Sequence, residues 1–365
     1  MKVQIETNVF RDVVLRASKI INKNTTIEII KGILLTATKE GLVVTATNSD
    51  MTIQETIIKG VKIESEGAVV VPAKELVQLV KVYKRKEMNV QANENNHITI
   101  ENGKTQIQIP GLNAEEFPNV PEINADRIKL NGDTLKNMIE STIFACATSE
   151  ARPNLTGIKM ELDKKQLVLE ATDSHRLARK SFVLDDVSEE AAFLVVVPGG
   201  CMSYLASILK PEEIQLGFTV SQLVVEMGDL LFISRLLDVK YPDTKRIIPQ
   251  SFSTKIDLKR EEVIEAINLV TVVNDWDIIR LTITENDELK IEAKNVGQAY
   301  EYVPIQNLEG ENISLPLNPK YLYDALRASQ GESIRIGFTG KPTTSVLPSL
   351  DAPHELHLLL PVRDK

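Results

Sequence analysis

The chain has 365 residues, enough for two or three domains, and its hydrophobic fraction of 43% and charged fraction of 25% are those of a soluble globular protein. Its formal net charge of −9 argues at first against a nucleic-acid partner. The two cysteines, Cys146 and Cys201, form no CxxC pair, no apolar run approaches the ~18 residues of a membrane span, and the N-terminus does not resemble a signal peptide. We therefore expect buried, reduced thiols in a cytoplasmic protein.

In chain order, the first predicted elements are a strand at 2–6 and a helix at 8–23. The helix is indicated by an apolar stripe that runs from Val9 through Phe10, Val13, Val14 and Ala17 to Ile20 and Ile21. An antiparallel pair of strands, a further strand, a proline, a helix at 73–87 and alternating strands (HITIENGKTQIQI) follow. The same order begins again at RIKLN, with helices at 133–148 and 199–210, and at KIDLK, with helices at 259–272 and 319–329.

Two landmarks show that the chain is a threefold repeat. The strands GLVVTATNSDM, QLVLEATDSHR and ELKIEAKNVGQ begin at Gly41, Gln166 and Glu288, about 120 residues apart. The predicted strand-to-helix junctions place Pro72, Pro198 and Pro316 at a similar spacing, and proline is favoured at a helix start. We predict an α+β protein of three domains, 1–124, 125–250 and 251–365, each with sheets outside and two helices packed on them.

Apparent catalytic motifs do not fit enzyme chemistry. GFTGKPTTS (337–345) is not a phosphate loop, because Arg335 and Pro342 stand where glycine and a hydroxyl residue are required. Asp173, Ser174 and His175 are adjacent on what we take for an extended segment, so they point to opposite sides and cannot form a triad. The same argument separates His354 from His357, and His97 is expected at the surface. We expect no catalytic residue, no metal and no cofactor.

Positive charge is concentrated in the first two predicted helices. Helix 8–23 carries four basic side chains against one carboxylate, and helix 73–87 carries five against two. The spacing puts Arg16, Lys19 and Lys23 on one face of the first helix, and Lys74, Lys81 and Arg85 on one face of the second. A solvated helix face is the simpler interpretation. On a concave surface, however, these cations would hold DNA phosphates without reading sequence. No aromatic platform for single strands is evident, so the expected ligand is a duplex.

The chain resembles the bacterial sliding clamp family, the beta subunit of DNA polymerase III, over essentially its whole length. The segments that carry the resemblance are TSEARPNLTGI (148–158), ATDSHRLA (171–178), SRLLDVKYPDTKRIIP (234–249), NPKYLYDAL (318–326) and LLLPVR (358–363). The resemblance implies a head-to-tail homodimer, in which domain 1 of one subunit meets domain 3 of the other and twelve helices line a pore around duplex DNA. Such a ring is a non-catalytic processivity factor that tethers the replicative polymerase.

Two sets of site residues are expected, the first from the distribution of basic side chains and the second from the resemblance. The expected DNA-contacting residues are Arg11, Arg16, Lys19, Lys23, Lys74, Lys81, Lys84, Arg85 and Arg152. A pocket between domains 2 and 3 is expected to take a leucine- and aromatic-rich peptide of the polymerase, the clamp loader and other partners. The pocket positions are Leu155, Thr172, Ser174, His175, Arg176, Leu177, Pro242, Arg246, Ile247, Asn318, Tyr321, Leu358, Leu360, Pro361, Val362 and Arg363.

Some positions depart from the family pattern. These are Glu28, where proline is usual, VNDWDII (273–279) near the expected dimer contact, the segment after Gly340 and the final Asp364-Lys365. They leave open an alternative function, that of a divergent clamp paralogue with repair or regulatory partners. A third interpretation is that the chain is an unrelated repeat protein or an enzyme.

Overall fold

The computed structural model describes residues 1–120, 127–339, 345–347 and 354–363, with the backbone alone at 345–347. The predicted boundary at 124, the segment after Gly340 apart from that strand, and Asp364-Lys365 lie outside the described residues. The chain divides into two compact units. Unit 1 comprises residues 1–133 and 207–236, and unit 2 comprises residues 134–206 and 237–365. No described helix is long and apolar enough to cross a membrane.

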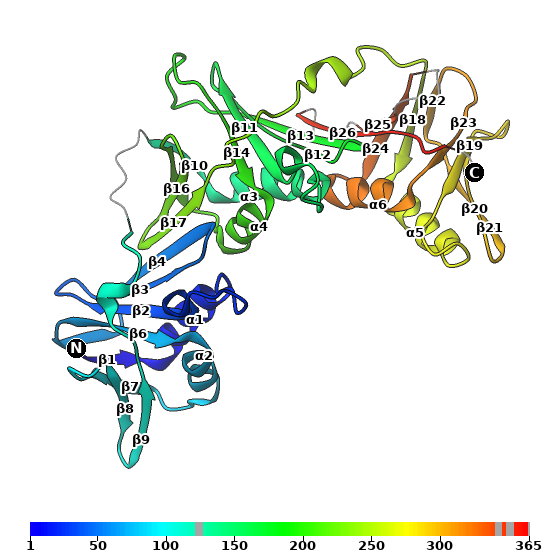
Figure 1. Cartoon of the computed structure of the whole chain (residues 1–365). Coiled ribbons are helices and arrows are strands. Elements are labelled where there is room, and N and C mark those ends of the chain that lie inside the picture. Colours follow the sequence, from blue (N-terminus) through cyan, green and yellow to red (C-terminus); the bar gives the residue numbers. More distant parts are fainter. Residues whose placement is uncertain (121–126, 340–344, 348–353, 364–365) are drawn as a thin grey trace. The chain divides into compact units, whose positions relative to one another are not determined.

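Unit 1 contains two antiparallel sheets (Figure 1). The first has the order β5-β1-β7-β8-β9, formed by Val61–Ser65, Lys2–Glu6, Glu87–Ala92, His97–Asn102 and Thr105–Pro110. The second has the order β10-β15-β16-β17-β4-β3-β2-β6, formed by Arg127–Asn131, Glu213–Phe218, Gln222–Met227, Leu230–Arg235, Met51–Ile57, Leu42–Thr47, Gly32–Ala37 and Gly67–Pro72. Strand β17 of the second repeat pairs with β4 of the first, so one sheet crosses the junction between these repeats.

Helices α1 (Thr7–Ser18) and α2 (Ala73–Val82) pack side by side in unit 1 (Figure 1). The predicted stripe is buried at Phe10, Val13, Val14 and Ala17. Both helices are shorter than predicted. Beyond the end of α1, the Asn22 and Thr25 side chains accept the backbone N–H groups of residues 24 and 27, which favours a loop there.

Unit 2 also contains two sheets. The larger has the order β14-β11-β12-β13-β26-β25-β24-β18-β22, formed by Phe193–Pro198, Gly157–Asp163, Gln166–Thr172, Arg176–Val183, Glu355–Leu359, Ser345–Leu347, Ser333–Phe338, Thr254–Lys259 and Asn307–Glu309. The smaller has the order β21-β20-β19-β23, formed by Gln298–Pro304, Glu288–Lys294, Ile279–Ile283 and Ser314–Leu317. Strand β13 of the second repeat pairs with β26 of the third, which repeats the junction seen in unit 1.

The other helices of the described residues are α3 (Gly132–Glu140), α4 (Gly199–Ile208), α5 (Arg260–Thr271) and α6 (Pro319–Ala328). All six predicted helices are therefore present. Helix α3 ends early because the Thr142 hydroxyl donates to the Met138 and Ile139 carbonyls. In the third repeat, α5, α6 and both sheets enclose a continuous core that includes Ile267, Ile291 and Leu326.

The threefold repeat is confirmed strand by strand, with one correction. The landmark strands are β3, β12 and β20, and the prolines Pro72 and Pro198 immediately precede α2 and α4. Pro316 does not stand at a helix start as predicted. It lies inside β23, opposite Arg280, and α6 begins instead at Pro319, capped by the Asn318 side chain.

Candidate functional site

The pocket residues predicted from the sequence all lie in unit 2, and two of them, Ser174 and His175, lie in the turn between β12 and β13. Asp173 Oδ1 accepts the backbone N–H groups of His175 at 2.9 Å and Arg176 at 3.0 Å, and Ser174 has φ = 82°. The segment is therefore a tight turn and not the extended chain that we expected. The triad remains excluded for another reason, because the Asp173 carboxylate is occupied by backbone N–H groups and by Arg176.

Arg176 lies at the centre of the predicted pocket but is occupied by its own chain. Its Nε lies 3.0 Å from Asp173 Oδ2 and its Nη1 lies 2.7 Å from Asp324 Oδ2. The guanidinium lies 4.5 Å from the ring centre of Tyr321 and 5.3 Å from that of Phe144. Only 8% of the side chain is exposed. The guanidinium thus joins the β12–β13 turn to α6.

The C-terminal segment is hydrogen-bonded to the β12–β13 turn and to strand β23, which leads into α6. The Leu360 N–H donates to the His175 carbonyl at 2.9 Å, and the Val362 N–H donates to the Pro316 carbonyl at 3.1 Å. Leu358 stands opposite Leu177 in the β13–β26 pair, and both are 1% exposed. These two leucines belong to a small core cluster, whereas Leu360, at 37%, reaches the surface.

The linker that follows β17 supplies the exposed part of the predicted pocket. Tyr241 donates to the Glu170 carbonyl at 3.4 Å, and the Thr244 hydroxyl bonds the Glu170 carboxylate, so the linker is held on strand β12. Ile247 is 52% exposed and the Arg246 side chain is 88% exposed. These two side chains are therefore accessible to a partner.

The structure thus sorts the predicted pocket residues into two groups. Leu155, Thr172, Arg176, Leu177 and Leu358 are buried. The exposed or half-buried group is Ser174, His175, Pro242, Arg246, Ile247, Asn318, Tyr321, Leu360, Pro361, Val362 and Arg363. Sequence reasoning missed Phe144, Asp173 and Asp324, which surround Arg176. Asp324 could have been predicted as a pocket residue, because it follows Tyr321 by three residues on the same predicted helix.

Burial and ion pairs shift the pKa values of several groups around this site. Cys201 is buried as expected, whereas Cys146 is only half-buried; desolvation nevertheless raises the pKa of the Cys146 thiol to about 12. Burial also raises the pKa of Tyr321, with a smaller contribution from the Asp173 carboxylate. Glu355 is buried, which opposes ionisation, yet bonds to His357 and Lys180 bring its pKa below the ordinary value. No group of metal-ligating side chains occurs among the described residues.

The predicted DNA-contacting residues also fall into two groups. Arg11 donates to the Val80 and Tyr83 carbonyls at 2.7 and 2.9 Å, which ties α1 to α2. Arg16 pairs with Glu55 at 2.8 Å, Arg85 bonds Asn102 and Thr105, and Arg152 bonds Ser174. These four arginines thus have structural contacts of their own.

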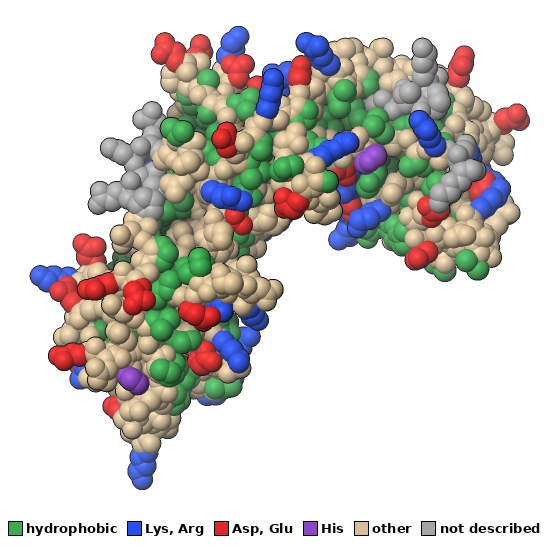
Figure 2. All heavy atoms as spheres, in the orientation of Figure 1, with side chains coloured by type: hydrophobic (Ala, Val, Ile, Leu, Met, Phe, Trp, Pro, Cys, Tyr) green, Lys and Arg blue, Asp and Glu red, His purple; other side chains and the backbone are tan. Residues whose placement is uncertain are grey.

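The lysines of the same set are different. Lys19, Lys23, Lys74, Lys81 and Lys84 are all exposed, and none forms an ion pair within the described part of unit 1. Lys23 and Lys84 lie beyond the ends of α1 and α2, so the face predicted on two long helices is in part formed by the loops that follow them. Figure 2 shows basic side chains beside these two helices.

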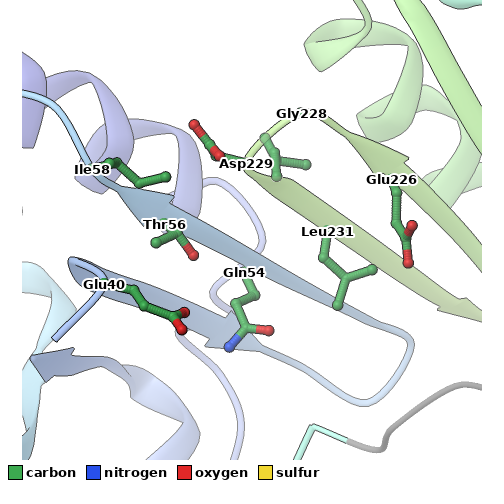
Figure 3. A pocket seen from close by; sticks show the side chains of 9 residues that line it. Glu40, Gln54, Thr56, Ile58, Glu226, Gly228, Asp229 and Leu231 are labelled. Atoms are coloured by element: carbon green, nitrogen blue, oxygen red, sulfur yellow. The ribbon is translucent and has the colours of Figure 1, made fainter. Parts of the chain in front are cut away.

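A separate groove of about 340 Å³ lies in unit 1 over the β4–β17 pair (Figure 3). Ile58, Thr56 and Gln54 line it from the β4 side, and Leu230 and Leu231 from β17. Glu40, Glu226 and Asp229 add carboxylates. No predicted site residue lines this groove.

Comparisons with known proteins agree with the repeat. The N-terminal, central and C-terminal domains of the DNA polymerase III beta subunit match residues 1–121, 129–243 and 245–363. The beta sliding clamp of Bacillus subtilis (strain 168) is 32% identical over 100% of both chains, and that of Staphylococcus epidermidis RP62A is 33% identical over 94% of each. The solved sliding clamp from Bacillus subtilis superposes with a TM-score of 0.96 at 31% identity, and the beta subunit of Streptococcus pyogenes with 0.95 at 26%, each over the full length of both chains.

Three α+β repeats, with sheets that cross the junctions between neighbouring repeats, define a protein of the DNA clamp class. The chain belongs to the DNA polymerase III beta subunit family, the bacterial beta sliding clamps. Its function is that of a DNA sliding clamp, a non-catalytic replication subunit with DNA and a DNA polymerase as partners.

Proposed function

We propose that two copies of this chain form a closed head-to-tail ring around duplex DNA, which tethers the replicative polymerase. The observation that carries this proposal is the threefold repeat with sheets continuous across both junctions, because it supplies half of a six-domain ring. Topological linkage then keeps the protein on DNA without tight contacts. This role places the chain on nucleoid DNA in the cytoplasm. The three domains of each subunit in this proposed ring are residues 1–124, 125–250 and 251–365.

Two open sheet edges and an apolar surface support the dimer. Strand β9 ends the five-stranded sheet of unit 1, and β21 ends the four-stranded sheet of unit 2. Near β21, Leu269 and Val272 at the end of α5 are 53% and 81% exposed, and Tyr300 is 55% exposed. Exposed edges and apolar groups of this kind favour association with another chain. We propose that domain 3 meets domain 1 of the second copy here.

The dimer is tested by mass in solution. At micromolar concentration we expect a particle of twice 40.7 kDa. Changing Leu269 and Val272 together to aspartate should give monomers, because each buried carboxylate would lack a partner. The matched control is Val220→Asp, at a fully exposed turn position, which should leave the dimer intact. A monomer from the unchanged chain, or a dimer that survives the double change, would contradict this contact.

For the DNA interface, we propose that the exposed lysines Lys19, Lys23, Lys74, Lys81 and Lys84 make the main phosphate contacts. The four arginines of the predicted set add to the positive potential but are held by their own chain. Contacts from lysine to phosphate are independent of base sequence and weaken with salt. A mobile clamp requires holding of this kind.

For protein partners, we propose that the exposed and half-buried pocket residues bind a peptide with leucine and phenylalanine anchors. Ile247, Leu360 and Val362 offer apolar surface, and each fully buried anchor contributes about 1.5–3 kcal/mol. Arg246 and Arg363 are the accessible guanidinium groups for a peptide carbonyl or carboxylate. The free energy from two buried anchors, less the entropy cost of ordering the peptide, gives modest affinity. Modest affinity allows different partners to exchange on the same pocket.

Calorimetric titration with a leucine- and phenylalanine-containing peptide tests the pocket. Removing residues 358–365 should abolish binding, and removing 360–365 should do so while sparing the buried residues Leu358 and Leu359 of β26. Ile247→Ser should weaken binding severalfold, whereas Ile58→Ser, at an equally exposed position of unit 1, should not. Unchanged affinity in a folded, truncated protein would place the site elsewhere. No structural observation favours the divergent-paralogue alternative over the replicative role.

A further inference from the structure

The contacts of Arg176 raise a question about its role in the proposed pocket. A guanidinium that is to bind a partner's carboxylate must be accessible, but this one is 8% exposed and already faces two carboxylates, Asp173 and Asp324. Two aromatic rings, Phe144 and Tyr321, cover it. A partner would have to displace one of these contacts to reach it. Its role is therefore to hold other groups in place.

The first repeat shows that the fold of the turn does not require this arginine. At the equivalent turn, Asn48 Oδ1 accepts the N–H groups of Asp50 and Met51 at 2.8 and 2.9 Å, as Asp173 does for His175 and Arg176. The carbonyl of Asp50 accepts the Arg235 N–H at 2.9 Å, just as that of His175 accepts the Leu360 N–H. Methionine thus occupies the position of Arg176 in a turn with the same hydrogen bonds. The ion pairs of Arg176 must serve something other than turn formation.

The ion pairs of Arg176 hold helix α6 against the β12–β13 turn, and these two elements form one side of the pocket. Asp324 is on α6, three residues after Tyr321, and its bond to Arg176 draws that helix to the turn. In this arrangement the Tyr321 and His175 rings stack at 6.4 Å. The C-terminal segment bonds to the turn at His175 and, at Pro316, to strand β23, which leads into α6. A shift of α6 relative to the turn would therefore separate the surfaces that a peptide has to contact together.

We propose that Asp324 is a positioning residue of the partner pocket, which acts through Arg176 to hold Tyr321 and His175 in the geometry that binds peptide. The proposal rests on the pocket proposed above. It adds a residue that touches no partner, and it gives Arg176 a structural role in the pocket instead of direct contact with the peptide. Recognition of a partner's carboxylate then belongs to Arg246 and Arg363.

The test compares Asp324→Asn, Asp324→Glu and Arg176→Met, with Asp163→Asn as control at the exposed end of strand β11 in the same unit. In calorimetry with the leucine- and phenylalanine-containing peptide, Asp324→Asn and Arg176→Met should each weaken binding about tenfold, because a charge-assisted bond is lost. Asp324→Glu should recover most of this loss, and the control should bind as the unchanged chain does. The double variant Arg176→Met with Asp324→Asn should bind no more weakly than the poorer single variant.

A second readout does not depend on the peptide. Amide hydrogen exchange of segments 172–177 and 316–323 should become faster in Asp324→Asn and return in Asp324→Glu, with the melting temperature almost unchanged. Unchanged affinity and exchange in Asp324→Asn would overturn the positioning role, as would losses that multiply in the double variant. If the unchanged chain fails to bind the peptide, the pocket proposal fails, and the exchange experiment still decides whether Asp324 holds the turn.

Discussion

Replacing Glu355 with leucine perturbs a buried charge cluster at the junction between the second and third repeats. Glu355 is 2% exposed, and its Oε2 lies 2.6 Å from Lys180 Nζ on the neighbouring strand. Its Oε1 lies 2.8 Å from His357 Nε2. A carboxylate can only accept, so Nε2 carries the proton, and the buried Nδ1 has no hydrogen-bond partner among the described residues. Loss of the carboxylate leaves both Lys180 and His357 unpaired in the interior.

The expected cost is large because breaking a buried ion pair from one side destabilises a protein by about 3–5 kcal/mol. The double change Lys180→Met with Glu355→Leu should cost less, about 1–3 kcal/mol, since only the bonds of His357 and Ser141 to the carboxylate are then lost. The first junction shows that leucine suits the position: Leu230 there stands opposite Glu55, as Glu355 stands opposite Lys180. Glu55 has its own partner in Arg16.

Urea unfolding followed in unit 2, for example by hydrogen exchange of β26, measures these free energies. The folded-state pKa of Glu355 is lowered, so its stabilising contribution is present above the unfolded pKa and is lost as pH falls through the folded value. The difference in stability between the unchanged chain and Glu355→Leu should therefore shrink in acid. A single-variant loss below about 1 kcal/mol, or a double variant as unstable as the single one, would refute the reasoning.

Three further predictions concern other parts of the chain. Changing Lys19, Lys23 and Lys81 to alanine should weaken DNA retention equally for all DNA sequences and reduce the slope of log affinity against log salt by about 0.9 per lysine. Arg11→Ala should instead lower the melting temperature. If the lysine and arginine variants changed DNA retention and melting temperature alike, the distinction between DNA-contacting lysines and structural arginines would be wrong. Cys146 and Cys201 should resist alkylation at neutral pH, since burial raises the pKa of Cys146 to about 12 and Cys201 is 1% exposed; rapid labelling of the folded protein would be the contrary result. Arg335 lowers the pKa of Asp257, so Arg335→Met should lose stability at neutral pH and little in strong acid, as measured by thermal unfolding across pH; a loss independent of pH would argue against it.

The helices were predictable from sequence because their apolar spacing survives in the core, as at Phe10, Val13 and Ala17. Their ends were not. Helix α1 ends at Ser18, and α2 ends at Val82, after which Tyr83 is extended. Apolar and basic residues continue past both points, so composition gave no sign of the change.

The site was predictable as a set of segments but not as a set of roles. Whether a basic side chain is available depends on partners far away in sequence, such as Glu55 for Arg16 and Asp324 for Arg176. A charge count treats Arg16 and Lys19 alike, although one is paired and half-buried and the other is exposed. The family pattern likewise names Leu177 and Leu358 with Leu360, and only the register shows that the first two belong to a core.

The most direct test of the ring is retention of the clamp on closed and on cut DNA. Protein loaded onto a nicked circular plasmid by the clamp loader is separated from free protein by gel filtration, and the plasmid is then linearised by a single-site nuclease. A ring held by topology stays on the circle and runs off the free ends, and blocking those ends with a bound protein restores retention. Equal retention on circular and linear DNA would mean that the protein grips the duplex directly, and the account of a closed sliding ring would be wrong.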